Sequence, residues 1–546
     1  MTEAITAFSE CTGTLYYAFT QEQVDDLLHS AFGQMTQPET AFLDVFKENA
    51  DLQDRARIAE LCGMAAVGIY YERRSDQDSG PPAALAEYFY VISKLMLDSS
   101  IAAHPLRAMK VCSLLAMYNI VVKASVALEY VELGLALGNR HGMDKPECPP
   151  TLSAEEFLDY KRTWRTLVLF SGWLGATLGY ISAHANGALK LWEGEKDIGE
   201  DGIVQLEMVK ITIIKAKIVQ TMPDESTANN ANDATIDWLR QELRTLYDGL
   251  PERMAIRNLQ EQRHDQRLRR AIFYVHLFYL SAMELLHRRA MASSLAFDQS
   301  VDLSFIAPSS YVNAAVREGL MAAKMATRIL ALMKEDDAMV QICWLCIYTA
   351  YTAGIIILYT AVRKVLNGFP SASWSADMTL ATTCINTLDY CGEVDDVATR
   401  FRETLQTYLS TLQNAVDGEV NENLGRDIEE ESSVEYLFGI KHGSSDLQKA
   451  SRDLLSLLQR PFRKSLELMP QGVAGPQLNS TLINWMEAAL GASGEWVWEL
   501  QNCGIEVGYG MGNDNHLEEI ISALDSGYFV GTATDAGWKM WTPHMA

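Results

Sequence analysis

Basic residues are scarce in this sequence of 546 residues. It has 45 Lys and Arg against 71 Asp and Glu, which gives a formal net charge of −26. A surface this acidic repels a phosphate backbone unless a separate basic patch overrides the repulsion. We therefore expect no direct binding of nucleic acid by this chain.

A secretion signal and a pattern of paired cysteines are also lacking. The N-terminus, MTEAITAFSECTGTLYYAF, has neither a basic flank leading into an apolar run nor a small-residue cleavage site. The nine cysteines are odd in number and scattered, mostly within apolar helical patterns. This usage predicts reduced, buried thiols of an intracellular protein.

Long hydrophobic runs are lacking apart from one, Val340 to Val362, which has no charged residue in 23 positions. As a helix it is long enough to cross a bilayer. However, Tyr348, Tyr351 and Tyr359 fall on one helical stripe, and their hydroxyl groups need partners that lipid cannot provide. Acidic residues precede the run, and no aromatic belt brackets both of its ends. We predict a central buried helix and no membrane span.

Signatures of catalysis are missing as well. The sequence has no Gly-x-Ser-x-Gly elbow, no His-Glu-x-x-His helix and no phosphate-binding loop. A six-cysteine zinc cluster needs six thiols close together, and only Cys343 and Cys346 form a Cys-x-x-Cys. Thiolates inside an apolar helix would lack charge compensation, so we interpret this pair as core packing.

Two further chemical patterns are incomplete. Glu284 and His287 have the Glu-x-x-His spacing of di-iron bundles, and His276 lies on nearly the same helical face, but no second pair faces them. We interpret the two histidines as ordinary, partly buried residues. Three aspartate pairs suggest a terpene cyclase, but each lacks the third carboxylate needed to hold magnesium. We therefore assign no catalytic residue, no metal site and no cofactor.

What the sequence does contain is helical periodicity. Apolar residues recur at spacings of three and four from about Asp51 to Ala415, and runs of strict alternation are short. This pattern predicts an all-α, large multi-helix domain. The segment SAEEF, starting at Ser153, is typical of a helix N-cap with carboxylates in the first turn.

An acidic stretch separates this helical region from the C-terminus. Glu419 to Tyr436 holds seven acidic residues and one Arg, which is typical of a solvated linker. We therefore predict a helical region over 1–415, a linker over 416–435 and a C-terminal segment over 436–546.

The C-terminal segment is acidic and aromatic. From Ser465 to Trp538 there is no Lys or Arg, while ten Asp or Glu alternate with large apolar residues. This composition is typical of partly helical segments that fold onto a partner's groove. The alternative is an acidic helical subdomain packed back on the core. Candidate residues for binding a coactivator are Trp496, Trp498, Tyr528 and Phe529.

Three stretches resemble a known family. Leu106 to Pro146, followed by Tyr160 to Tyr180, resembles the regulatory middle homology region of fungal zinc-cluster transcription factors. Arg162 and Trp164 match the family's Arg-x-Trp, and Gly179 matches a later glycine, whereas Ser171 replaces an Asp.

The second and third stretches follow in the family's order. Ala271 to Ala290 is similar to its His-Leu-x-Tyr helix ending in His-Arg, carried by His276, Leu277, Tyr279, His287 and Arg288. Cys384 to Leu412 looks like its late helix, in which a small residue precedes an Arg, here Ala398 and Arg400. Together the three stretches span roughly residues 7 to 415 and indicate a divergent member.

The resemblance implies an all-helical, nuclear region that restrains or transmits activity between a zinc cluster and a C-terminal activation segment. Its implied partners are coactivators or other transcription proteins, and some family members are thought to sense small molecules. The zinc cluster is absent from this sequence. We therefore expect either a shortened regulator or a relative that has lost DNA binding.

A different class of function stays open: a standalone, cytoplasmic protein that binds a small apolar metabolite in a helical cavity and acts as a biosynthetic enzyme. Positioning and a few hydrogen bonds could supply such catalysis without a motif. No clean heptad run is present, so we expect a monomer or weak homodimer. The candidate lining residues are Trp164, Trp173, His276, Tyr279, Trp344, Tyr348 and Tyr351, each of which is otherwise ordinary core.

Overall fold

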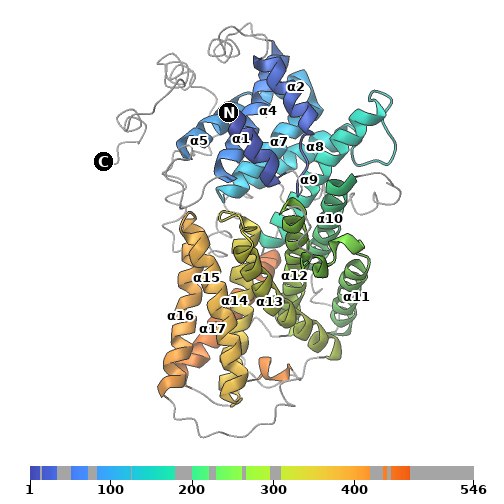
Figure 1. Cartoon of the computed structure of the whole chain (residues 1–546). Helices are drawn as coiled ribbons and strands as arrows, with labels where there is room; N and C mark the ends of the chain where they lie inside the picture. The colour runs from blue at the N-terminus through green and yellow to red at the C-terminus, as the bar shows by residue number, and fades with distance from the viewer. Residues whose placement is uncertain are drawn as a thin grey trace, which may run out of the picture.

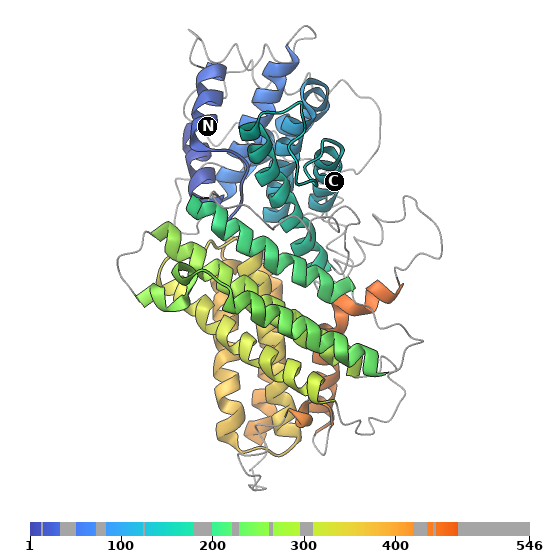
Figure 2. The same cartoon turned by 90° about the vertical axis from the view of Figure 1, so that its right-hand side faces the viewer.

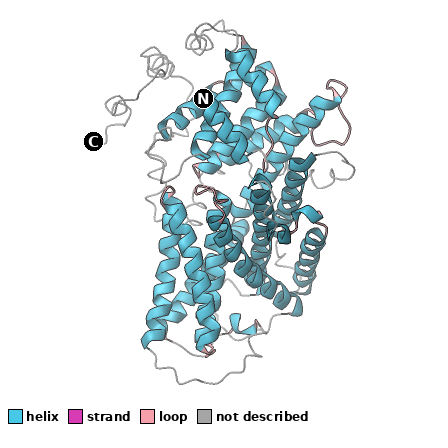
Figure 3. Ribbon diagram, in the orientation of Figure 1, coloured by secondary structure: helices cyan, strands magenta, loops and turns pink. Residues whose placement is uncertain are grey.

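The protein is all-α, as predicted. The computed structural model describes residues 1–12, 15–32, 51–71, 83–123, 126–178, 199–220, 229–260, 266–294, 309–418, 434–439 and 444–467. This part of the chain forms 16 α-helices and a few short 3-10 turns, and it contains no strand (Figure 3).

The helices run from the first residues to the end of the described chain. Their bounds are α1 Thr2–Thr12, α2 Gln21–Phe32, α4 Leu52–Tyr71, α5 Ala83–Leu95, α6 Leu97–Ala103, α7 Pro105–Val121, α8 Ala127–Arg140, α9 Ala154–Leu178, α10 Gly199–Gln220, α11 Asn229–Asp248, α12 Gln266–Ser294, α13 Ser310–Glu335, α14 Trp344–Leu366, α15 Ser371–Gly392, α16 Asp396–Gly418 and α17 Ser445–Glu467.

Helices α9 and α10 connect two groups of helices. Helices α1 to α8 gather at one end of the molecule and α13 to α17 at the other (Figure 1). Helix α9 contacts α7 and α8 in the first group and packs on α10, which in turn contacts α12. Figure 2 shows α10 to α13 lying across one face of the body.

Helix α14 is the central helix of the second group. It contacts α12, α13, α15, α16 and α17. It is long and apolar enough to cross a membrane, yet 94% of its most apolar window is buried in the protein. The prediction of a central buried helix is confirmed. The helix begins at Trp344 and ends at Leu366, four residues later at each end than the apolar run suggested.

Two tyrosines of the stripe on α14 have hydrogen-bond partners for their hydroxyl groups. The Tyr359 hydroxyl donates to the Leu437 carbonyl at 2.8 Å. The Tyr348 oxygen accepts from Arg288 at 3.1 Å. Protein groups thus satisfy both hydroxyls inside the body, as the sequence argument required.

The start of α9 is a capping box. The Ser153 Oγ accepts from the Glu156 amide at 3.1 Å, and the Glu156 carboxylate accepts from the Ser153 amide at 2.9 Å. Each residue satisfies an amide that the first helical turn leaves free. The predicted N-cap at Ser153 is confirmed, and it fixes where the long helix carrying Trp164 and Trp173 begins.

The predicted late helix over Cys384 to Leu412 is wrong, because the chain turns within it. Helix α15 ends at Gly392 and α16 begins at Asp396. The Asp395 carboxylate accepts from the amides of Val397 and Ala398 at 3.0 and 3.1 Å, and so caps α16. Ala398 and Arg400 therefore lie in the first turns of a separate helix.

The helical body extends beyond the predicted end at residue 415. Tyr436, Leu437 and Phe438 are buried in the same hydrophobic core as α14. Further on, Leu454 and Phe462 of α17 are buried there too, and α17 contacts α12, α14 and α16. The linker prediction falls largely on 419–433, outside the described residues.

Substitution of Gly68 tests how closely α1 packs on α4. A Cβ at Gly68 would overlap the carbonyl oxygen of Ala4. Gly68→Ala should therefore push α1 away and destabilise the fold by about 1–3 kcal/mol, the usual range for overpacking. Urea denaturation gives the energy, and hydrogen exchange should show faster exchange in α1.

Gly368→Ala is the matched control. Gly368 has φ of 73° and open space around its Cβ position, so alanine there meets backbone strain of about 1–2 kcal/mol without a clash. The Gly368→Ala variant should leave hydrogen exchange in α1 as it is in the wild type. Equal exchange in both variants would contradict the close contact of α1 with α4.

Candidate functional site

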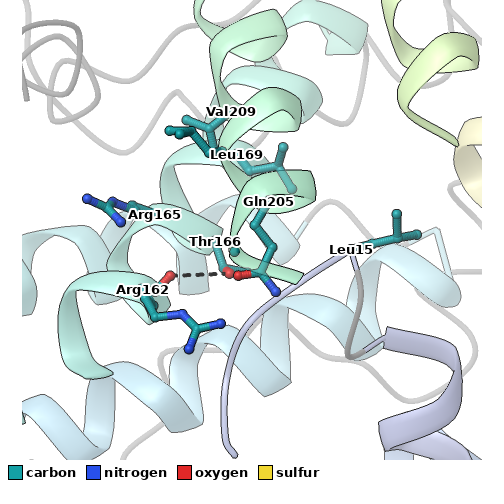
Figure 4. A pocket seen from close by; sticks show the side chains of 9 residues that line it. Leu15, Arg162, Arg165, Thr166, Leu169, Gln205 and Val209 are labelled. Carbon is teal, nitrogen blue, oxygen red and sulfur yellow. Dashed lines mark hydrogen bonds between the residues drawn. The ribbon is translucent and has the colours of Figure 1, made fainter. Parts of the chain in front are cut away.

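A small cavity lies between α9 and α10 (Figure 4). Its volume is about 10 Å³, about the space that one water molecule needs. None of the seven residues predicted to line a metabolite cavity faces it. The lining residues are Leu15, Arg162, Arg165, Thr166, Leu169, Gly202, Gln205, Leu206 and Val209. This cavity does not have the volume for an apolar metabolite.

The structure distributes the seven predicted lining residues over several helix contacts. Trp164 is fully buried on α9, and its Nε1 donates to the Asn139 Oδ1 of α8 at 2.8 Å. Trp173 meets Phe278 of α12 edge to face, with ring centroids 6.2 Å apart. These two tryptophans fasten α9 to different neighbours.

His276 and Tyr279 form a second group with Tyr247 of α11. The His276 Nε2 is 2.8 Å from the Met254 carbonyl oxygen, and burial lowers the pKa of His276. Tyr279 packs on Tyr247 with centroids 4.6 Å apart. A neutral His276 can donate to the Met254 carbonyl and so holds the turn after α11 against α12.

Trp344, Tyr348 and Tyr351 lie together on α14. Trp344 packs on Tyr348 with centroids 5.4 Å apart, and Tyr351 stacks on Phe401 of α16 at 3.9 Å. Phe401, which the sequence argument missed, also contacts Trp344. Each of these rings thus packs against another ring. That they bind a ligand stays a prediction.

A cluster of polar residues is buried where α10, α12 and α14 meet. The Glu284 Oε2 accepts from the Thr352 hydroxyl at 2.7 Å. Lys215 donates to the Ser281 hydroxyl at 2.8 Å. Glu284 and His287 are 1% and 0% exposed, and His276 is 3% exposed, so the expectation that the two histidines are only partly buried is wrong. Helix α13 covers His287, whose Nδ1 is 2.8 Å from the Val316 carbonyl oxygen.

Burial shifts the pKa values of this cluster toward the neutral forms. It raises the pKa of Glu284 to about 7, against the Thr352 hydroxyl, Arg288 and Lys215, which favour the charged carboxylate. It lowers the pKa of Lys215 to about 7 and that of His287 to about 4. Three ionisable side chains thus share an interior where each charged form costs free energy.

Three polar atoms of the cluster have no hydrogen-bond partner within the described chain. They are the Glu284 Oε1, the His287 Nε2 and the Thr349 Oγ1. Such atoms are uncommon in interiors because each costs about 1–3 kcal/mol. The described residues contain no group of three or more His, Cys, Asp or Glu that could hold a metal ion. The cluster can bind and release protons near neutral pH, because the pKa values of Glu284 and Lys215 are both about 7.

The remaining predicted site residues lie outside the described part of the chain. These are Trp496, Trp498, Tyr528 and Phe529. Other residues of the buried cluster, Lys215 and Thr352, escaped the sequence analysis because no motif carries them. Their only signal is a polar residue beside strongly apolar neighbours in the sequence.

Comparisons with known proteins add no further assignment, since no model of a protein family, no curated protein and no solved structure matches this chain.

Replacing Glu284 tests the buried cluster through the pH dependence of stability. The folded carboxyl has a pKa of about 7 against an ordinary 4.5, so the folded state binds more protons between these pH values. The contribution of Glu284 to the stability of the wild type should therefore fall as pH rises through this window. Relative to Glu284→Gln, the loss should reach about 3 kcal/mol, measured by urea denaturation at several pH values.

Thr352→Val provides a matched variant. It removes the hydroxyl that lowers the pKa of Glu284, so the loss of stability should continue to a higher pH than in the wild type. Parallel stability curves for the wild type and Glu284→Gln from pH 4.5 to 7 would rule out the raised pKa.

Proposed function

We propose that the chain is the regulatory and transactivation region of a fungal zinc-cluster transcription factor. It would act in the nucleus through coactivators and other transcription proteins, and DNA would not be bound by this chain. The observation that carries the proposal is the ordered series of family-like motifs around Trp164, His276 to Arg288, and Arg400. The acidic, aromatic composition after Ser465 adds the activation segment.

The contacts of the motif residues support this proposal. Trp164 links α9 to α8 through Asn139, and His287 links α12 to the Val316 carbonyl of α13. Arg288 donates to the Leu458 carbonyl of α17 at 3.1 Å. Side chains that join neighbouring helices in this way hold the motif helices together as one scaffold, which the proposed regulatory region needs.

Helix α17 provides a physical route from the body to the C-terminal segment. Its apolar stripe, which includes Leu447, Leu454 and Leu458, is buried in the core, and the acidic, aromatic segment follows directly after it. Arg288 fixes α17 to both α12 and α14, because it also donates to the Tyr348 hydroxyl at 3.1 Å. A change in the packing of α12 would reach α17 through this side chain.

A reporter assay tests the proposed function. The whole chain, fused to a foreign DNA-binding domain, should activate transcription of a reporter gene. Deleting 468–546 should abolish activation, because it removes the acidic, aromatic residues while leaving α17 and the body intact. Immunoblotting should confirm equal levels of the two fusions.

Alanine variants sharpen the test. Replacing Trp496, Trp498, Tyr528 and Phe529 together should lower activation at least several-fold, since aromatic residues are the usual anchors of such interfaces. Tyr311→Ala, at an exposed position of α13, is the control and should leave activation unchanged. Full activation by the fusion that lacks 468–546 would refute the proposal.

A further inference from the structure

The start of α14 brings two cysteines to positions that face each other. Cys343 is the N-cap residue, with φ of −66° and ψ of 111°, and Cys346 is the third residue of the helix. In a capping box the side chains at these two positions turn toward each other. The sequence argument placed both thiols within a helix. The structure moves Cys343 just outside it, which changes what the pair can do.

Both cysteines lie in the hydrophobic core, Cys343 nearer its edge. Cys343 is 9% exposed and Cys346 is fully buried. The Cys346 thiol donates to the Tyr274 hydroxyl of α12 at 3.7 Å. Cys343 therefore lies nearer the protein surface than Cys346.

Hydrogen bonds join the chain just before Cys343 to both groups of helices. Lys123, in the turn after α7, donates to the Ile342 carbonyl at 2.9 Å and pairs with Asp395 at 2.8 Å. The Gln341 amide donates to the Tyr390 carbonyl of α15 at 2.9 Å. A covalent change at Cys343 therefore occurs where α7, α14 and the turn between α15 and α16 meet.

The two thiols differ in acidity. A hydrogen bond with the Cys346 thiol lowers the pKa of Cys343 to about 6, and the Tyr274 hydroxyl and the amides of Cys346 and Leu345 act in the same direction against burial. Burial raises the pKa of Cys346. Burial also raises the pKa of Cys112 to about 12, so that thiol stays protonated.

We propose that Cys343 and Cys346 form a peroxide-sensitive thiol pair that closes reversibly into a disulfide. Cys343 is the attacking thiol and Cys346 the resolving thiol. The assignment rests on the N-cap geometry, on the slight exposure of residue 343 and on the fully buried partner three residues later. It does not depend on the proposed role in transcription.

The reaction balances with hydrogen peroxide as the oxidant. The Cys343 thiolate attacks one peroxide oxygen, the O–O bond breaks, and the departing hydroxide takes up a proton to become water, leaving a sulfenic acid. The Cys346 sulfur then attacks the Cys343 sulfur, the S–O bond breaks, and the hydroxide leaves with the thiol proton as a second water. Two thiols lose two electrons, and a dithiol reductant restores them.

Peptide mass spectrometry tests the pair in the full-length chain. Trypsin cleavage after Lys334 and Arg363 yields a peptide, 335–363, that contains Cys343 and Cys346 and no other cysteine. After treatment with peroxide and alkylation of the free thiols, this peptide should appear about 2 Da lighter than its reduced form and carry no alkyl group. Dithiothreitol should restore two alkylation sites.

Three variants separate the roles of the thiols. Cys346→Ser should stop at a Cys343 sulfenic acid that dimedone traps, and Cys343→Ser should leave Cys346 unoxidised. The Cys391→Ser variant should still form the disulfide. If it did not, the pairing of Cys343 with Cys346 would be overturned.

In the wild type, oxidation should be about tenfold slower at pH 5 than at pH 7, because the thiolate fraction of a thiol with pKa about 6 changes by that factor.

The wild-type chain supplies internal controls that need no substitution. Cys62 and Cys112, which are both 0% exposed against 9% for Cys343, should stay reduced under the same treatment. Oxidation of the exposed Cys148 at a peroxide dose that leaves peptide 335–363 with two free thiols would overturn the proposal. An oxidation rate of the pair that does not change from pH 5 to pH 7 would do the same.

Discussion

The burial of one helix on all of its sides is the constraint on which this structure depends. Helix α14 has almost no polar face, so it needs neighbouring helices around its whole circumference. Helices α12, α13, α15, α16 and α17 supply them. Its glycine, Gly354, marks how tight the enclosure is, because a Cβ there would overlap the side chain of Leu405 on α16. The second half of the molecule is arranged around this requirement.

An apolar centre also dictates where polar groups can go. Near the carboxyl end of α14, Lys364 pairs with Asp377 of α15 at 2.8 Å, and both side chains are fully buried. Arg363 donates to the Tyr436 carbonyl at 3.1 Å. A buried charge without such partners would cost several kcal/mol. These pairs therefore constrain which helices can lie beside α14, and in which register, more than they add to stability.

The sequence predicted those features that depend on local periodicity. The capping box at Ser153 needs two residues three apart, and the burial of α14 follows from the absence of charge together with its tyrosine stripe. Both could be derived without any long-range information, and both agree with the structure. The all-α class follows in the same way from the spacing of apolar residues.

Features that depend on contacts between distant residues could not be derived. The break between α15 and α16 is capped by Asp395, but this residue is held in place by Lys123, which lies 272 positions earlier. The N-cap position of Cys343 depends on the same lysine through the Ile342 carbonyl. The pKa of Glu284 depends on Lys215 and Thr352, from two other helices. No window of sequence contains these pairs.

These long-range contacts give α14 its place in the proposed regulation. Its 23 residues extend about 34 Å at 1.5 Å per residue. At one end, Lys123 ties the preceding loop to the turn after α7, and at the other, Arg363 holds the segment at Tyr436 that precedes α17. Well-packed helices shift as units because their interiors do not compress. A displacement at the Cys343 end would therefore reach α17 through α14 itself, without a hinge between them.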